Sequence, residues 1–464
     1  MQFIENRTFA ELSIGDRAEL TRTLRQQDIE LFAVLSGDVN PAHVDADYAK
    51  SDMFHRVIAH GMWGGALISA VLGTELPGPG TIYLDQSLHF HHPVGIGDTV
   101  TVTVTVLELH ASDRRVVLEC RCSNQAGDTV IDGRAEVIAP EKKVRRPRAL
   151  LPEVHLHERG ARYDRLIEAT RTLPALRTAV VHPCDELSLR GALEARSQQL
   201  IEPLLVGPRA RIEAAAEESG LDLTGIELVD VPHSHAAAAR AVEMARHGEV
   251  EALMKGALHT DELMQAVVDA DSGLRTERRI SHVFVLDVPS YPKPLFITDA
   301  AINISPDLDI KRDIVQNAID LAHALGIDAP RVALLSAVET VYPKILSTVE
   351  AAALCKMAER GQILGGILDG PLAFDNAVSS QAAAAKHLTS PVAGHADILV
   401  VPDLEAGNML AKQLIYLAGA EAAGIALGAS VPIMLTSRAD GMLSRLASAA
   451  LALLYSHHRA PRST

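Results

Sequence analysis

The stretch Ser36-Gly37-Asp38-Val39-Asn40-Pro41-Ala42-His43-Val44-Asp45, followed by His60-Gly61-Met62, decides how the first third of this chain is interpreted. It places the carboxylate of Asp38 and the imidazole of His43 on a turn enforced by Asn-Pro, and such a pair can serve as general acid and base. Gly61 begins an apolar run that predicts a helix, so its backbone N–H is a candidate for stabilising developing negative charge. Asp38, His43 and Gly61 are our candidate catalytic residues.

A purely structural interpretation stands beside this one. Asp, Asn and Ser next to Pro are common turn and capping residues, and an isolated Asp-x-x-x-x-His pattern is usually a turn. Gly61 can equally serve the packing of a helix against a loop. The polar residues are nevertheless crowded between two apolar segments, and dense polar loops on a rigid scaffold often carry function. We place Asn40 at the substrate, with the turn as its main role.

The residues after this stretch predict one helix and then a sheet. Residues 61–73 are almost continuously apolar and lack charge, which predicts a buried helix. The hydrophobic period then changes to two in residues 86–93, 99–107, 116–122 and 129–138, with Gly and Asp at the turns. This alternation predicts an antiparallel sheet packed on the helix.

The motifs Ser-Gly-Asp-x-Asn-Pro-x-His-x-Asp at 36–45 and Ile-Ala-His-Gly-Met at 58–62 resemble the signature of the MaoC-like hot-dog family, the (R)-specific enoyl-CoA hydratases. The resemblance spans roughly residues 10–138. It implies an α+β hot-dog domain, which we assign to residues 1–140. It also implies that Asp38 and His43 activate one water, which adds to a 2-enoyl-CoA to give an (R)-3-hydroxyacyl-CoA.

Composition excludes several classes of protein. A formal net charge of −16 argues against general nucleic-acid binding, so an anionic ligand needs local Arg or Lys residues. The four cysteines show neither disulfide nor metal spacing, which leads us to expect a reducing, cytoplasmic compartment. Charges run through the first thirty residues and no apolar run reaches eighteen residues, so we expect neither secretion nor a membrane span.

Metals and cofactors are not expected either. The histidines at 89, 91 and 92 have no carboxylate or thiol at ligand spacing beside them, and His92 falls on the other strand face. The second half of the chain contains no Gly-x-Gly-x-x-Gly and no Walker-type loop, so no dinucleotide or nucleoside triphosphate is indicated.

A basic run, Glu-Lys-Lys-Val-Arg-Arg-Pro-Arg at 141–148, interrupts the strand pattern. We predict a charged linker at 141–160, with a phosphate-binding arm as the alternative. Beyond it, strand-like segments at 178–182, 203–207, 226–229 and 252–256 alternate with Ala-rich helical runs. This pattern predicts a mainly parallel sheet with helices on both faces, which we assign to residues 161–464.

Three stretches in this half carry groups suited to an anion. They are Met-Lys-Gly-Ala-Leu-His-Thr at 254–260, Gly-Leu-Arg-Thr-Glu-Arg-Arg at 273–279, and Thr-Ser-Arg-Ala-Asp at 436–440. The first stretch ends a predicted strand, the second precedes a strand, and the third lies at the carboxyl end of another strand, the edge of open α/β sheets at which ligands collect.

These stretches, with Thr-Asp-Ala-Ala at 298–301 and Glu-Ala-Gly-Asn at 405–408, resemble the phosphate acetyl/butyryltransferase family over about residues 175–456. The resemblance implies a two-subdomain α/β fold of the isocitrate/isopropylmalate dehydrogenase-like kind, usually dimeric, that exchanges an acyl group between CoA and phosphate. Arg438 and Arg275 are then the phosphate clamps, with Arg278 a weaker candidate. Ser437 donates to the carbonyl or the phosphate, and Lys255 and Asn408 line the pocket.

The chain departs from that family at two positions. Related enzymes carry an aspartate seven residues after the active-site serine, where this chain has Ser444. Gln265 lies near the expected place of a family arginine. Asp440 and Asp375 are only guesses for a base toward the CoA thiol.

We therefore expect a bifunctional, cytoplasmic, homo-oligomeric enzyme that uses acyl-CoA, enoyl-CoA and inorganic phosphate, with no cofactor, nucleic acid or membrane partner. One alternative keeps the second half as a noncatalytic acyl-CoA sensor and oligomerising platform for an active hydratase. Another has the hot-dog half only bind, or dehydrate, a different thioester.

Overall fold

The computed structural model describes residues 3–149, 154, 160–435 and 441–459. The chain divides into two compact units, Met1–Leu156 and His157–Thr464, and each is described by itself. Among the described helices, none is long and apolar enough to cross a lipid bilayer.

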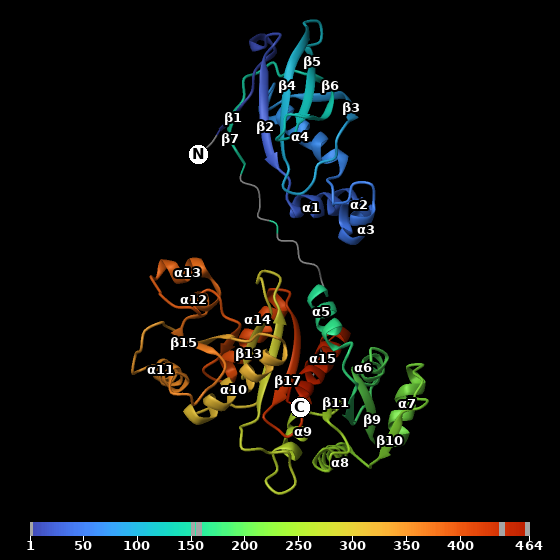
Figure 1. Ribbon diagram of the computed structural model, residues 1–464, viewed down its shortest axis with the longest axis vertical. Coiled ribbons are helices and arrows are strands. Elements are labelled where there is room, and N and C mark those ends of the chain that lie inside the picture. The colour runs from blue at the N-terminus through green and yellow to red at the C-terminus, as the bar shows by residue number, and fades with distance from the viewer. Residues whose placement is uncertain (1–2, 150–153, 155–159, 436–440, 460–464) are drawn as a thin grey trace. The chain divides into compact units, whose positions relative to one another are not determined.

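The first unit is built on an antiparallel five-stranded sheet in the order β2-β4-β5-β6-β3, drawn in blue to green-blue in Figure 1. Its elements are β1 (Phe3–Glu5), η1 (Phe9–Glu11), β2 (Arg17–Thr23), α1 (Gln26–Ser36), α2 (Pro41–Val44), α3 (Ala46–Ser51), α4 (Gly61–Thr74), β3 (Ile82–Phe90), β4 (Thr99–His110), β5 (Arg115–Ser123), β6 (Thr129–Ile138) and β7 (Arg145–Pro147).

The Thr-Val alternation of β4 explains why this segment is a strand with one buried face. Every second residue, from Val100 to Val106, is at most 1% exposed, and the threonines between them face outward. Val102 and Val104 pair with Cys122 and Cys120 of β5, whose side chains enter the same core. Burial raises the pKa of Cys122 to about 12, so this thiol is a core residue rather than a nucleophile.

Helix α4 packs on this sheet through its apolar side chains. Trp63, Ile68, Val71 and Leu72 are buried in the same cluster as the strand residues. The predicted buried helix at 61–73 thus corresponds to α4 (Gly61–Thr74), which starts at the glycine singled out for catalysis.

Part of the basic run predicted as a linker belongs to the first unit. Strand β7 pairs antiparallel with β1, and the Arg145 guanidinium lies 4.7 Å from the centre of the Phe3 ring. Lys143 forms ion pairs with Glu5 and Glu11 at 3.3 and 3.0 Å. Arg145 Nε also lies 3.8 Å from Glu5, so both Lys143 and Arg145 have acidic partners, which weakens the alternative that the run is a phosphate-binding arm.

The second unit contains an eleven-stranded mixed sheet in the order β10-β9-β8-β11-β18-β17-β12-β13-β16-β14-β15, drawn in green through red in Figure 1. Its elements are α5 (Ala161–Thr170), β8 (Leu176–Val181), α6 (Glu186–Ser197), β9 (Ile201–Gly207), α7 (Arg209–Glu218), β10 (Glu227–Asp230), α8 (Ser234–Arg246), β11 (Ala252–Lys255), α9 (Thr260–Val267), β12 (Ser281–Asp287), β13 (Leu295–Thr298), α10 (Leu308–Ala324), β14 (Arg331–Leu335), α11 (Leu346–Glu359), β15 (Ile367–Leu372), α12 (Phe374–Val378), α13 (Ser380–Ala385), β16 (Ile398–Val400), α14 (Leu404–Leu417), β17 (Glu421–Leu427), β18 (Ile433–Met434) and α15 (Met442–Arg459).

Most strands in this sheet run parallel, as the alternating strand and helix pattern predicts, whereas β12 and β17 pair antiparallel with their neighbours. One face carries a single apolar cluster with residues from α6, α7, α10, α11 and α15. The other face carries two separate clusters, one with α8 and α9 and one with α12, α13 and α14. The sheet is therefore covered continuously on one face and in two blocks on the other.

Candidate active sites

The loop that carries Asp38 is shaped by local hydrogen bonds. Helix α1 ends at Gly37, whose φ of 75° is a left-handed conformation that glycine adopts without strain. The Asp38 N–H then donates to Ser36 Oγ at 3.2 Å, and the Asn40 N–H donates to Asp38 Oδ1 at 3.2 Å. The side chain of Asn40 accepts the Ala42 N–H, so Asn40 caps α2. The turn role predicted for Asn40 is present, and its contact with substrate stays a prediction.

His43 lies on α2 and points toward the start of α4. Its Nδ1 is 2.9 Å from the Ile58 carbonyl oxygen, and because a carbonyl only accepts, Nδ1 is the donor. The Nε2 atom is then left with a lone pair for proton transfer. A nitrogen of His43, a carboxylate oxygen of Asp38 and a nitrogen of His60 all lie within 4.8 Å of one another. The structure thus brings the predicted pair together and adds His60.

The grouping of Asp38, His43 and His60 also has the composition of a metal site. The His43 and His60 rings, however, stack with centres 4.1 Å apart and planes inclined by 37°. Imidazole lone pairs lie in the ring plane, so stacked rings do not aim both nitrogens at one point as a tetrahedral metal requires. We interpret the cluster as an acid–base site.

Gly61 opens α4 beside a cavity of about 280 Å³. The cavity is lined mainly by apolar residues, among them Phe54, Trp63, Val94 and Ile131, and His43 and Gly61 lie on its wall. A Cβ atom at position 61 would meet Phe90 Cε1 at 3.0 Å, so glycine leaves room for a close approach. A thioester carbonyl at this wall could accept the N–H of Gly61 at the positive end of α4.

His89, on β3, and His91, just after β3, share a carboxylate partner that sequence spacing did not reveal. Asp132, on the neighbouring strand β6, lies 3.3 Å from His89 and 3.1 Å from His91. Sequence spacing could not show this partner, because strand pairing joins positions that are far apart in the chain. Among the described residues, Asp38, His43 and His60 form the one group of three or more His, Cys, Asp or Glu side chains whose potential ligand atoms lie within 4.8 Å of one another.

Lys255 ends strand β11 and is buried, with 5% of its surface exposed. Its Nζ donates to the Leu258 and Gly256 carbonyl oxygens at 3.2 and 3.4 Å. Strand β18 lies parallel beside β11, and Met254 is in register with Met434. The chain that follows Met434 therefore leaves the sheet next to Lys255. Ser437, Arg438 and Asp440 lie outside the described residues.

The loop with the predicted phosphate ligands Arg275 and Arg278 is tied to the end of β17. Thr276 Oγ1 donates to the Gly428 carbonyl at 2.7 Å, and Arg275 forms an isolated antiparallel bridge with Ala429. Arg275 is exposed, and its side chain makes no hydrogen bond or ion pair with any described residue. The two arginines line a cavity of about 420 Å³.

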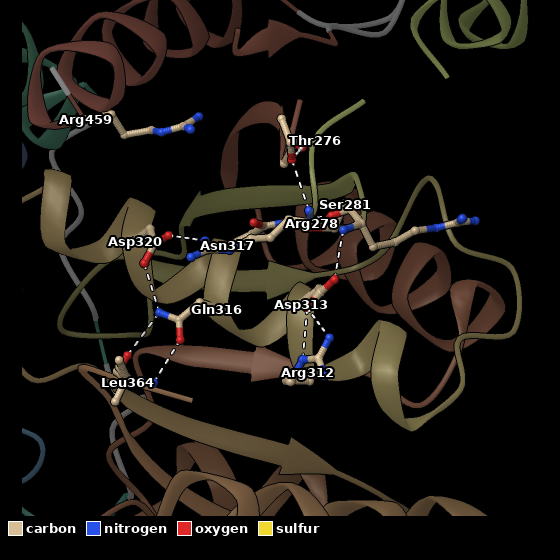
Figure 2. Close-up of polar contacts among 12 residues, drawn as sticks. Thr276, Arg278, Ser281, Arg312, Asp313, Gln316, Asn317, Asp320, Leu364 and Arg459 are labelled. Carbon is tan, nitrogen blue, oxygen red and sulfur yellow. Dashed lines mark hydrogen bonds and ion pairs between the residues drawn. The ribbon is translucent and has the colours of Figure 1, made fainter. Parts of the chain in front are cut away.

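Arg278 is not a free cation. Figure 2 shows its guanidinium directed at Asp320 of α10, with which it forms an ion pair, while Gln316 donates to the same carboxylate at 2.9 Å. A neutralised guanidinium is a weaker ligand for phosphate than a free one. Arg275 therefore has the freer charge of the two, and the role of either arginine at a phosphate stays a prediction.

The arginine loop and Lys255 lie at opposite edges of the sheet. Lys255 lies at the end of β18 that leads to Leu435, whereas Arg275 pairs with Ala429 at the opposite end of segment 429–435. The reason is the antiparallel pairing of β17 with both β12 and β18, which places the chain before β12 at the other edge.

Asn408 lies in the second turn of α14. The helix begins at Leu404 with Asp403 as its cap, so Gly407 and Asn408 lie about one turn inside it. Asn408 Nδ2 donates to the Ala300 carbonyl at 3.2 Å. A Cβ atom at Gly407 would lie 3.0 Å from Ala300 Cα, so glycine permits this approach to the loop after β13.

A buried polar network on that loop was missed in the sequence. Asp299, 3% exposed, accepts the N–H groups of Ala301, Ile302 and Asn303. Asn303 in turn accepts from Arg279 Nε at 2.8 Å, which joins this loop to the arginine loop. Thr298-Asp299 belongs to the motif that carries the family resemblance, but nothing in the letters indicates its partner.

The structure describes Ser444 and Gln265, which depart from the transferase pattern, and Asp375, a candidate base. Ser444 lies in the first turn of α15, where its carbonyl accepts the Ser448 hydroxyl at 2.8 Å. It borders a cavity of about 650 Å³ between α5 and α15. Gln265 lies on α9, and Asp375 lies in the first turn of α12.

Comparison with known proteins covers both units. The model of the Phosphate acetyl/butaryl transferase family matches residues 234–453, and that of the MaoC like domain matches residues 11–125. A phosphate acetyltransferase of Rhizobium meliloti is 65% identical over 299 residues, which are 64% of this chain and 95% of that protein.

Two solved structures are also similar to the chain. A branched-chain phosphotransacylase from Enterococcus faecalis V583 is 30% identical and covers 61% of this chain and 100% of its own, with a TM-score of 0.54. The R-hydratase PhaJ1 from Pseudomonas aeruginosa is 47% identical and covers 34% of this chain and 100% of its own, with a TM-score of 0.33. The chain therefore belongs to the phosphate acetyltransferase family through its second unit and carries a MaoC-like domain in its first.

Proposed function

We propose that the chain is a bifunctional enzyme. The first unit hydrates 2-enoyl-CoA to (R)-3-hydroxyacyl-CoA, and the second transfers an acyl group reversibly between CoA and inorganic phosphate. The hydratase assignment is carried by the meeting of Asp38 and His43, because His43 lines the same cavity as Gly61. The transferase assignment is carried by identity along almost the whole length of a phosphate acetyltransferase.

In the hydratase, Asp38 and His43 hold one water between them. One of the two takes a proton from the water as its oxygen bonds to the β carbon of the enoyl thioester, and a proton passes to the α carbon. Negative charge develops on the thioester oxygen, where the N–H of Gly61 and the N-terminus of α4 stabilise it. Ile58 supports this step because its carbonyl keeps the reactive nitrogen of His43 free.

In the transferase, a phosphate oxygen attacks the thioester carbonyl and the CoA thiolate departs, giving acyl phosphate. Both substrates are anionic, so fixed cations must place phosphate beside the carbonyl. We assign this role to Arg438 and Arg275, with Arg278 contributing less. Ser437 donates to the carbonyl or the phosphate, and Lys255 and Asn408 position the CoA side. We assign no cofactor to either reaction.

We further propose the isocitrate dehydrogenase-like classification for the second unit, a cytoplasmic location and a homo-oligomer. Exposed apolar side chains on α14 support the oligomer: Met409, Tyr416 and Leu417 are 66%, 70% and 80% exposed. Single exposed apolar residues are common, but three on one helix favour a covered surface.

The test is paired assays on the purified chain. We expect hydration of crotonyl-CoA, and release of free CoA from acetyl-CoA or butyryl-CoA only when phosphate is present. Arg438→Ala should lose the second activity and keep the first. CoA release that does not depend on phosphate would refute the transferase half, and failure to hydrate crotonyl-CoA would refute the hydratase half.

A second candidate function follows from Ser444 and Gln265, which stand where the transferase pattern has an aspartate and an arginine. In this alternative the second unit binds acyl-CoA without turning it over and serves as an oligomerising platform. A wild type that makes no acyl phosphate, together with an Arg438→Ala variant of unchanged hydration rate and oligomeric state, would favour it.

A further inference from the structure

His60, the residue before α4, is the most deeply buried member of the group it forms with Asp38 and His43, and only 3% of its surface is exposed. Its Nε2 lies 3.0 Å from the backbone oxygen of Asp38. A carbonyl oxygen can only accept, so Nε2 carries the hydrogen and donates. His60 therefore holds the main chain at the residue whose carboxylate is placed in the reaction.

The second nitrogen of the His60 ring has a different environment. Nδ1 is buried and has no hydrogen-bond partner among the described residues. A buried N–H without an acceptor is destabilising, so the surroundings suit a lone pair at this atom. The surroundings of the two ring nitrogens therefore favour the tautomer of His60 with hydrogen on Nε2, the atom that donates to Asp38.

The faces of the His60 ring are also occupied. The His43 ring stacks on it at 4.1 Å between centres, and Phe32 lies 5.0 Å away. The hydrogen bond from His43 Nδ1 to Ile58 fixes the edge of the His43 ring, and the stack fixes its face. These two contacts leave His43 little freedom to swing away from Asp38.

We infer that His60 is a positioning residue of the hydratase, which holds the Asp38 carbonyl with its edge and the His43 ring with its face. The inference rests on the proposed hydratase function. His60 transfers no proton in this account. It keeps the Asp38 carboxylate and the His43 imidazole at a fixed distance from each other. A misplacement of about 1 Å at such a site can cost about 100-fold in rate.

The test compares His60→Phe and His60→Gln in the full-length chain with crotonyl-CoA as substrate. Phenylalanine keeps an aromatic ring for the stack but has no donor for Asp38. Glutamine keeps a donor near the position of Nε2. We expect kcat of the His60→Phe variant to fall about 10- to 100-fold while KM stays within about threefold. The His60→Gln variant should recover at least about tenfold of that loss.

Unchanged kcat in His60→Phe, or a His60→Gln variant no better than His60→Phe, would overturn the positioning role. Loss of folding is recognised separately, because Trp63 is the single tryptophan of the chain and lies on α4 in the same unit. Its fluorescence during urea unfolding should give similar midpoints for wild type and His60→Gln.

A second measurement does not depend on activity. The wild type and His60→Gln are labelled with nitrogen-15 histidine and compared by NMR at pH 7.5. The signal that is present in the wild type and missing from the variant belongs to His60. We expect it to be that of a neutral ring with hydrogen on Nε2. Hydrogen on Nδ1 would overturn the clamp on Asp38. If the wild type hydrates no crotonyl-CoA, the proposed function fails, and the tautomer still decides whether His60 holds Asp38.

Discussion

The guanidinium of Arg278 is held by the carboxylate of Asp320, whereas Arg275, three residues earlier in the same loop, has an exposed side chain that no described residue holds. Two arginines of one loop thus differ in the charge they can offer to an anion. The assignment of the phosphate ligand can therefore be tested by comparing a variant of Arg275 with a variant of Arg278.

We predict that Arg275→Ala raises KM for phosphate in CoA release by about 10- to 100-fold, because a charge-assisted hydrogen bond contributes about 1.5–3 kcal/mol. Arg278→Ala should change this KM less than about threefold, since its charge is already neutralised. Steady-state kinetics with varied phosphate measure both. Because Arg275 lies at the opposite end of segment 429–435 from Lys255, an unchanged KM in Arg275→Ala would remove it from the site.

Asp38→Asn should lower kcat for crotonyl-CoA by at least about 100-fold, because an amide cannot take a proton from water. The matched control is Asp45→Asn in the same polar stretch. Asp45 caps α3 by accepting the Asp47 and Tyr48 N–H groups at 2.9 Å, and asparagine caps nearly as well. Equal losses in the two variants would indicate damage to the loop rather than removal of a catalytic group.

Gly133→Ala should destabilise the first unit. A Cβ atom there would lie 1.9 Å from the Ser87 carbonyl oxygen on the paired strand, so the backbone must shift, at a cost of about 1–3 kcal/mol or more. Gly73→Ala is the control, because its Cβ would meet nothing within 4 Å and alanine favours a helix. Urea unfolding followed by Trp63 fluorescence reports both variants, and phosphate-dependent CoA release should persist in each. Equal midpoints for the two variants would contradict the close contact.

The second unit should lose stability as pH falls from 8 to 5. Burial lowers the pKa of His282 to about 3, whereas in the unfolded chain the ring titrates near about 6.5. Below that value the unfolded state binds a proton that the folded state excludes, so unfolding becomes easier as the solution is acidified. The loss from this ring amounts to about 2 kcal/mol at pH 5.

Urea unfolding followed by far-ultraviolet circular dichroism measures this loss. Trp63 lies in the first unit, so the transition of the second unit is the one that appears in circular dichroism and not in Trp63 fluorescence. The control is His282→Leu, which replaces a buried ring by an apolar side chain and should remove about one proton from the pH dependence. A variant with the same pH dependence as the wild type would show that His282 is not the titrating group.

The loop that carries Asp38 and His43 and the sheet of the first unit could be predicted because their signals are local. Asp38 and His43 are five positions apart on a turn that Asn-Pro dictates, and the Thr-Val alternation of β4 follows from the period of a strand. The partners of these residues could not be predicted. Asp132 reaches His89 and His91 only because β6 pairs with β3, and the hydrogen bond from His60 to Asp38 closes a loop of 22 residues.

The amino-acid sequence and the tertiary contacts therefore supply different information about this chain. The resemblance of short motifs to known families was sufficient to predict two acyl-CoA families in one chain, and the five-residue spacing of Asp38 and His43 was sufficient to name the candidate acid–base pair. Strand register and side-chain packing alone placed Arg275 and Lys255 at opposite ends of a segment, paired Arg278 with Asp320, and stacked His60 beneath His43. Local preferences act over a few residues, whereas these relationships depend on contacts between distant segments that form only when the whole sheet assembles.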